Sequence, residues 1–143
     1  MEALAGASSV IAVVGLAGQV VQGCGYLNSV FSSIKNAPHD LELLIRELEI
    51  IQVVAGALSD ENFRNSPVPM GWDPTPALEF CMEAIGKAQK LALAYGGPNG
   101  NVDHMKMRKR VQMGMSQEKI RKHLGRLERA KTHLIACNST RLL

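Results

Sequence analysis

Aromatic residues are scarce in this chain of 143 residues, where one Trp, two Tyr and three Phe make up 4% of the sequence. A surface that binds single-stranded nucleic acid by stacking bases on aromatic side chains is therefore not expected. Hydrophobic residues make up 46% of the chain and charged residues 20%, which is enough apolar material for one core and excludes wholesale disorder. The length fits a single domain over residues 1–143, with a core of aliphatic side chains.

Cysteine is also scarce, with Cys24, Cys81 and Cys137 far apart in the sequence. An odd number at wide spacing provides neither a disulfide framework nor a CxxC metal pair. We expect a reducing compartment and cysteines that act as small buried hydrophobic residues. Histidines are scattered and lack metal-ligand spacing: His39, His104, His123 and His133. No metal ion, no cofactor and no enzymatic activity are expected.

A phosphate-binding glycine loop is missing as well. The segment Val10–Gly18 has the character of a first strand and turn, but Val13 stands where a dinucleotide site needs glycine. Gly18 and Gly23 have the spacing of a P-loop, yet Cys24 and Gly25 follow where Lys and Ser or Thr are required. Nucleotide binding is therefore not expected.

Charge is absent from Ala3 to Ile34, and the chain begins Met1-Glu2, without the positive region of a secretory signal. We expect this segment to be retained. It reaches the length of about 20 apolar residues that spans a bilayer, although its many Ala and Gly gain little in lipid. It is the candidate membrane-inserting segment, and the alternative is a core helix of the bundle. The residues predicted to insert are Val10, Ile11, Val13, Val14, Leu16, Val20 and Val21.

Positive charge is concentrated at the other end. Residues 1–103 carry 5 Lys/Arg and 11 Asp/Glu, a net charge of −6, and residues 104–143 carry 11 Lys/Arg and 2 Asp/Glu, a net charge of +9. Near an anionic leaflet each basic residue contributes about 1 kcal/mol of attraction. The residues predicted to bind anionic lipid are Lys106, Arg108, Lys109, Arg110, Lys119, Lys122, Arg126 and Arg129.

The alternative for these basic residues is a solvated face, partly neutralised by acids of other helices. The acids considered are Glu42, Glu47, Glu49, Glu79 and Glu83. Nucleic-acid binding is not expected, because the sequence has neither a helix-turn-helix pattern nor interleaved aromatic residues.

The periodicity predicts four helices and no alternating strands, hence an all-α, up-and-down bundle. An apolar helix is expected over about 3–34, with a kink near Gly23–Gly25. The β-branched residues at Val10–Val14 leave a strand possible there. The apolar run is longer than a typical strand, however, and this favours a helix. A helix over about 38–58 follows, whose apolar face is Leu41, Leu44, Leu48, Ile51, Ala55 and Leu58, widened by Ile45.

A Pro-rich loop is expected over 59–76, followed by a helix over about 77–95 with Asp73 or Thr75 as N-cap. The expected face of that helix is Leu78, Met82, Ile85, Gln89, Ala92 and Tyr95, flanked by Cys81, Ala88 and Leu91. A long basic helix over about 102–137 completes the bundle, with a stripe of Met113, Ile120, Leu124, Leu127, Leu134 and Cys137. Four further side chains are hypothesised to line a surface that is exposed when the first helix leaves: Met105, Met107, Met113 and Met115.

Three stretches resemble the N-terminal domains of fungal STAND (NLR-like) proteins, called HeLo, HeLo-like or SesA-type. The first is Ala12–Val21, similar to the N-terminal helix of that family, and the second is Ser33–Leu41, similar to its step S-x-K-x-A-P-x-x-[IL] into the second helix. The third is Ile120–Leu134, similar to its pattern I-x-x-x-L-x-R-L-E-R-x-K-x-x-L. Together they span nearly the whole chain.

The resemblance implies a helical bundle ahead of a NACHT or NB-ARC module, of which this sequence has no motif. It implies an effector of programmed cell death and heterokaryon incompatibility that oligomerises on activation and moves from the cytoplasm to the plasma membrane. There it inserts its N-terminal helix and forms pores. Domains of this family look similar to the four-helix executioner domain of the mixed-lineage-kinase-like pseudokinase. The alternative is a non-enzymatic homotypic or adaptor domain that does not enter membranes.

Overall fold

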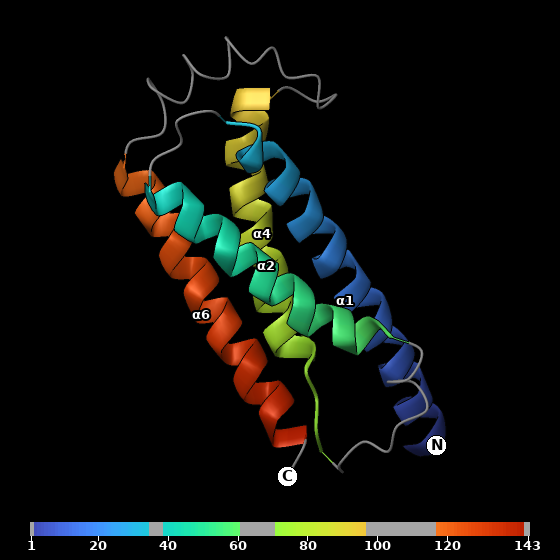
Figure 1. Ribbon diagram of the computed structural model, residues 1–143. Coiled ribbons are helices and arrows are strands. Elements are labelled where there is room, and N and C mark those ends of the chain that lie inside the picture. Colours follow the sequence, from blue (N-terminus) through green and yellow to red (C-terminus); the bar gives the residue numbers. More distant parts are fainter. Residues whose placement is uncertain (1, 35–38, 61–70, 97–116, 142–143) are drawn as a thin grey trace.

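Four α-helices make up the fold in the computed structural model, which describes residues 2–34, 39–60, 71–96 and 117–141 (Figure 1). They are α1 (Glu2–Ser32), α2 (His39–Ser59), α4 (Thr75–Gly96) and α6 (Gln117–Arg141). No strand occurs in these four ranges, so the expected all-α bundle is confirmed, and Val10–Val14 is helical as the length of the segment predicted. The expected basic helix is described from Gln117 onward. Lys106, Arg108, Lys109 and Arg110 and the methionines Met105, Met107, Met113 and Met115 lie outside the described residues.

The helices run alternately up and down, but chain neighbours are not always neighbours in space. Helix α1 packs against α2 and α4, and α6 packs against the same two, so that α1 and α6 lie on opposite sides of the bundle (Figure 1). The segment between α2 and α4 therefore connects two helices at diagonally opposite corners of the four-helix bundle. As a result α2 and α6 are parallel neighbours, joined by Arg121 to Asp40 at their beginnings and by Lys131 to Glu47 further along.

The core is aliphatic, and its α2 contribution is the predicted one. The buried residues of α2 are Leu41, Leu44, Leu48, Ile51, Ala55 and Leu58. In α6, Ile120, Leu124, Leu127 and Leu134 are buried as predicted, and Ala130 is buried in addition. Cys137, placed on the same stripe, is only partly buried.

The buried face of α4 differs from the prediction. Leu78, Ile85 and Ala92 are buried as expected, whereas Met82 and Gln89 are only partly buried. Of the residues expected to flank that face, Cys81 and Ala88 are buried and Leu91 is partly buried, and Ala84 is buried in addition. Small side chains in the core allow helices to approach closely, so the buried face of α4 combines Leu78 and Ile85 with small residues rather than with Met82 and Gln89.

Helix α1 runs without interruption from Glu2 to Ser32, so its helical assignment shows no break at the glycines where a kink was expected. Gly23 instead accommodates the neighbouring helix: a Cβ added there would lie 2.8 Å from Cγ2 of Ile85 in α4. The chain leaves α1 in a tight turn, in which the Ser33 amide and hydroxyl both donate to the Val30 carbonyl.

The N-cap residue of α4 lies between the two predicted ones, Asp73 and Thr75. The first intrahelical bond runs from the Leu78 amide to the Pro74 carbonyl (2.9 Å), which makes Pro74 the N-cap residue. The Asp73 carboxylate accepts from the Thr75 amide at 3.0 Å and so satisfies one free N–H of the first turn. Just before it, the Trp72 indole donates to the Cys137 carbonyl (2.7 Å) and ties this entry to the end of α6.

Candidate functional site

From Val10 to Ser32, the exposed face of α1 carries no charge. From Val10 onward its exposed residues are Ile11, Ala12, Gly15, Gln19, Gln22, Tyr26, Ser29 and Ser32. Each of the other three helices exposes several charged side chains: Glu42, Arg46 and Glu49 in α2, Glu79, Glu83, Lys87 and Lys90 in α4, and Lys119, Lys122 and Arg129 among others in α6. From Val10 to Ser32, α1 is thus set apart from the other described helices by an outer surface without charge.

The residues predicted to insert into a membrane divide between this outer face and the core. Val13 and Val20 are buried in the core, and Ile11 is 63% exposed. The other four are partly buried and pack against the core: Val10, Val14, Leu16 and Val21. In this arrangement α1 is both the predicted apolar segment and one wall of the bundle.

By length and composition, one segment of the described helices could cross a membrane, Val10–Ser32 of α1. Its 23 residues correspond to about 34 Å of helix, against a hydrocarbon core of about 30 Å. Core helices of bundles meet the same criterion, and 33% of the tested window is buried here. The neutral exposed face is therefore more informative than the length.

On the side of α6 that faces α2, cations are neutralised. Lys131 contacts both carboxylate oxygens of Glu47, at 3.0 and 2.8 Å, and both side chains are largely buried. Arg121 donates to Asp40 at 3.2 Å. The alternative of neutralisation by other helices thus holds here for Glu47, one of the five acids considered.

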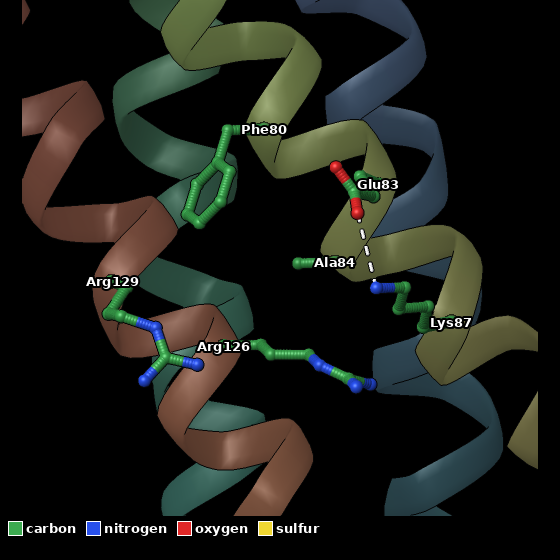
Figure 2. A pocket seen from close by; sticks show the side chains of 6 residues that line it. All are labelled: Phe80, Glu83, Ala84, Lys87, Arg126 and Arg129. Atoms are coloured by element: carbon green, nitrogen blue, oxygen red, sulfur yellow. Dashed lines mark ion pairs between the residues drawn. The ribbon is translucent and has the colours of Figure 1, made fainter.

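On the side that faces α4, the cations gather at a groove. A hollow of about 210 Å³ is lined by Phe80, Glu83, Ala84, Lys87, Arg126 and Arg129 (Figure 2). Arg126 extends from α6 across the groove toward α4, and Phe80 points from α4 toward α6. Within the described part of the chain, Arg126, Arg129 and Lys122 form no ion pair.

The pKa of a neighbouring histidine is affected by these positive charges. Burial lowers the pKa of His123, and the positive charges of Arg126, Lys122 and Lys87 lower it further. Its Nδ1 is buried and has no hydrogen-bond partner within the described chain. His123 is therefore neutral at pH 7 and leaves the positive charge of this side to the lysines and arginines.

Two thiols lie inside the bundle. Burial raises the pKa of Cys24 in α1 to about 12, with a smaller contribution from Cys81, and burial raises the pKa of Cys81 in α4 to about 12. Burial and the Asp73 carboxylate also raise the pKa of Cys137. Because the thiolate is the reactive form, the two buried cysteines are inert while α1 stays in place.

Sequence reasoning identified Arg126 and Arg129 through the basic stripe but missed their partners in the groove. Phe80 and Lys87 come from α4, and neither stands out in its own segment. Their i, i+7 spacing places them on one side of α4. Their meeting with α6 depends on how the helices pack. Lys119 and Lys122, the other described residues of the predicted set, are exposed on α6.

Within the described ranges, no group of three or more His, Cys, Asp or Glu side chains could hold a metal ion. Comparison of the chain with protein-family models, with curated proteins and with solved structures finds no match.

Proposed function

We propose that the chain is the effector domain of a fungal NLR-like cell-death protein, which docks on anionic lipid and permeabilises the membrane by inserting α1. The observation that supports this most is the neutral exposed face of α1, from Ile11 to Ser32. A helix that keeps its backbone groups bonded internally and carries no charge can enter lipid without desolvating an ion. The resemblance to HeLo-like and SesA-type domains points the same way.

The proposed sequence of events has three steps. Oligomerisation brings several bundles together, and the basic surface of α6 attracts them to an anionic leaflet. Helix α1 then leaves its contacts with α2 and α4 and crosses the bilayer. Because α1 lies on the opposite side of the bundle from α6, its removal leaves the α2–α6 and α4–α6 contacts in place.

The test places charge on α1 without disturbing the resting bundle. The double variant Ile11→Glu, Gln22→Glu changes two exposed side chains of α1, and Gln22 lies near the middle of the Val10–Ser32 segment. An ionised side chain at the bilayer centre costs about 2.5–3.5 kcal/mol on insertion scales. We expect dye leakage from vesicles with anionic lipid to fall at least roughly tenfold, since about 1.4 kcal/mol corresponds to a factor of ten.

The matched control is Ile50→Glu, Val53→Glu, which adds the same charge to exposed apolar positions of α2. It should leak more than the α1 variant, because the added negative charge weakens attraction to the membrane equally in both variants, whereas only the α1 variant carries charge into the bilayer. Each protein is assayed alone and as a fusion to a coiled-coil trimer, at low and physiological salt. Equal leakage from the α1 variant and the control would contradict insertion.

A second candidate function is a protein-interaction domain that never enters lipid. It is favoured by the exposure of Val53 (74%) and Ile50 (39%) on α2, since exposed apolar patches mark docking surfaces. In that case no vesicle leaks, vesicle charge has no effect on binding, and the α2 variant, not the α1 variant, loses its partner. The same pair of variants thus separates the two functions.

A further inference from the structure

The groove between α4 and α6 is a discrete hollow on the bundle surface. Arg126 and Arg129 line it from α6, one helical turn apart, and Lys87 lines it from α4 (Figure 2). Phe80 and Ala84 form its apolar wall. The Phe80 ring is held edge-on against His133 of α6, with the ring centroids 5.4 Å apart.

The charge of the groove is not balanced from within. The one acidic residue that lines it is Glu83, whose Oε1 lies 3.1 Å from Nζ of Lys87 on the same helix. Neither Arg126 nor Arg129 has an ion-pair partner among the described residues. The groove thus holds two guanidinium groups and a lysine against one carboxylate. Burial lowers the pKa of nearby His123, and the positive charges of Arg126, Lys122 and Lys87 lower it further.

This excess is particular to one side of α6. On the α2 side, Arg121 and Lys131 each contact a carboxylate of α2. A basic face that served only general attraction would have no need of the hollow or of the apolar wall that the α4 side adds.

The size and chemistry of the groove suit a small dianion. Its volume of about 210 Å³ is below the roughly 300–1,000 Å³ of typical cofactor sites. Arginine presents a planar fork of donors that matches phosphate oxygens, often in pairs. We propose that Arg126 and Arg129, with Lys87, form a binding site for a phosphate monoester, whose organic group packs on Phe80.

The phosphate site shares Arg126 and Arg129 with the basic surface that is proposed to bind anionic lipid. In that respect the site rests on the proposed function. Binding of inorganic phosphate, however, needs neither a membrane nor movement of α1. Leakage that fails while phosphate still binds contradicts insertion alone. Phosphate binding that fails while leakage persists contradicts only this site.

The experiment is a titration of the chain with inorganic phosphate at constant ionic strength, followed by the NMR signals of the arginine Nε–H groups. We expect saturable shifts at Arg126 and Arg129. Arg126→Gln and Arg129→Gln should each weaken binding at least roughly tenfold, the order expected for a charge-assisted bidentate contact. Arg121→Gln is the matched control, since it removes the same charge from the same helix but on the α2 side.

Further arms identify the source of the phosphate. Phenyl phosphate should bind more tightly than inorganic phosphate if Phe80 packs on the ester, and Phe80→Ala should remove that gain. Sedimentation with vesicles compares phosphatidic acid, a monoester lipid, with phosphatidylserine at equal surface charge. If the chain prefers phosphatidic acid vesicles, the site binds a lipid headgroup. If it binds phenyl phosphate tightly but shows no preference for phosphatidic acid, the site binds a small metabolite.

Three results would overturn the site. One is equal weakening by Arg121→Gln, which would mean that only net charge matters. Another is the absence of saturable shifts, and the third is acetate binding as tightly as phosphate. Circular dichroism of each variant establishes that the helices are intact, which is expected because Arg129 is exposed and Arg126 is only partly buried.

Discussion

At the scale of single residues, the glycines of α1 have opposite surroundings. A Cβ on Gly23 would lie 2.8 Å from Ile85 Cγ2, a distance at which something must shift. A Cβ on Gly15 or Gly18 would meet nothing within 4 Å. Gly23 is thus required by the contact between α1 and α4, whereas Gly15 and Gly18 lower helix stability without a packing reason.

Gly23→Ala should therefore destabilise the bundle, and Gly15→Ala should not. Overpacking costs about 1–3 kcal/mol, and the better helix propensity of alanine returns about 1 kcal/mol. We expect Gly23→Ala to lower the free energy of unfolding by about 1 kcal/mol and Gly15→Ala to raise it by up to about 1 kcal/mol. Urea unfolding followed by circular dichroism measures both. Equal effects would mean that Ile85 simply moves aside.

What could be predicted at this scale depended on side-chain size. The buried face of α2 was predicted residue by residue, because large aliphatic residues recur there at steps of three and four. In α4 the buried residues Cys81, Ala84 and Ala88 are small, so their pattern carries little hydrophobic contrast. The role of Gly23 could not be predicted, because it depends on which residue of another helix lies opposite.

At the scale of helices, α6 differs between its two sides. Toward α2, the Lys131–Glu47 pair is largely buried, with exposed fractions of 23% and 14%, and its atoms come within 2.8 Å. The Arg121–Asp40 pair is longer, at 3.2 Å, and the arginine is 66% exposed. Solvent screens the second pair more than the first, so the two should differ in strength.

Double-mutant cycles to alanine should rank these pairs. For Lys131 and Glu47 we expect a coupling energy of about 1 kcal/mol or more, since hydrogen bonds to charged groups are worth about 1.5–3 kcal/mol when shielded. For Arg121 and Asp40 we expect at most about 0.5 kcal/mol, as for other exposed pairs. Unfolding in urea at low and high salt gives both values. A stronger coupling for the exposed pair would contradict the burial argument.

At the scale of the molecule, the basic stripe of α6 and the neutral segment of α1 were both visible in the sequence. Their positions on opposite sides of the bundle were not, because they follow from the diagonal passage between α2 and α4. The groove was likewise hidden, since Lys87 and Arg126 are brought together only when α4 and α6 pack. Periodicity gives the face of each helix, whereas the neighbour of that face is set by the packing of the whole bundle.

The same arrangement provides a reporter for the departure of α1. Cys24 and Cys81 are buried, and burial raises the pKa of each thiol to about 12. At pH 8 almost no thiolate forms, so a maleimide should label neither while the bundle is closed. Cys24 belongs to α1 and Cys81 to α4, which pack together. The Cys81 thiol also donates to the Ala130 carbonyl of α6, at 3.7 Å, so α1 supplies only part of its cover. If α1 leaves, Cys81 loses that part and its pKa falls toward the ordinary value of about 8.5, which raises its reactivity.

We expect vesicles with anionic lipid to accelerate labelling of Cys81 at least roughly tenfold, in a Cys24→Ala, Cys137→Ala background that leaves one thiol. Neutral vesicles should have no effect, because the basic surface is not engaged. Gly23→Ala should raise the rate even without lipid, since it loosens the contact between α1 and α4. The rate of Cys81 labelling in the closed bundle should rise with pH. It should stay low up to about pH 9 and rise only as the pH approaches the raised pKa of about 12. Leakage without faster labelling of Cys81 would show that membranes are breached while α1 remains packed on α4.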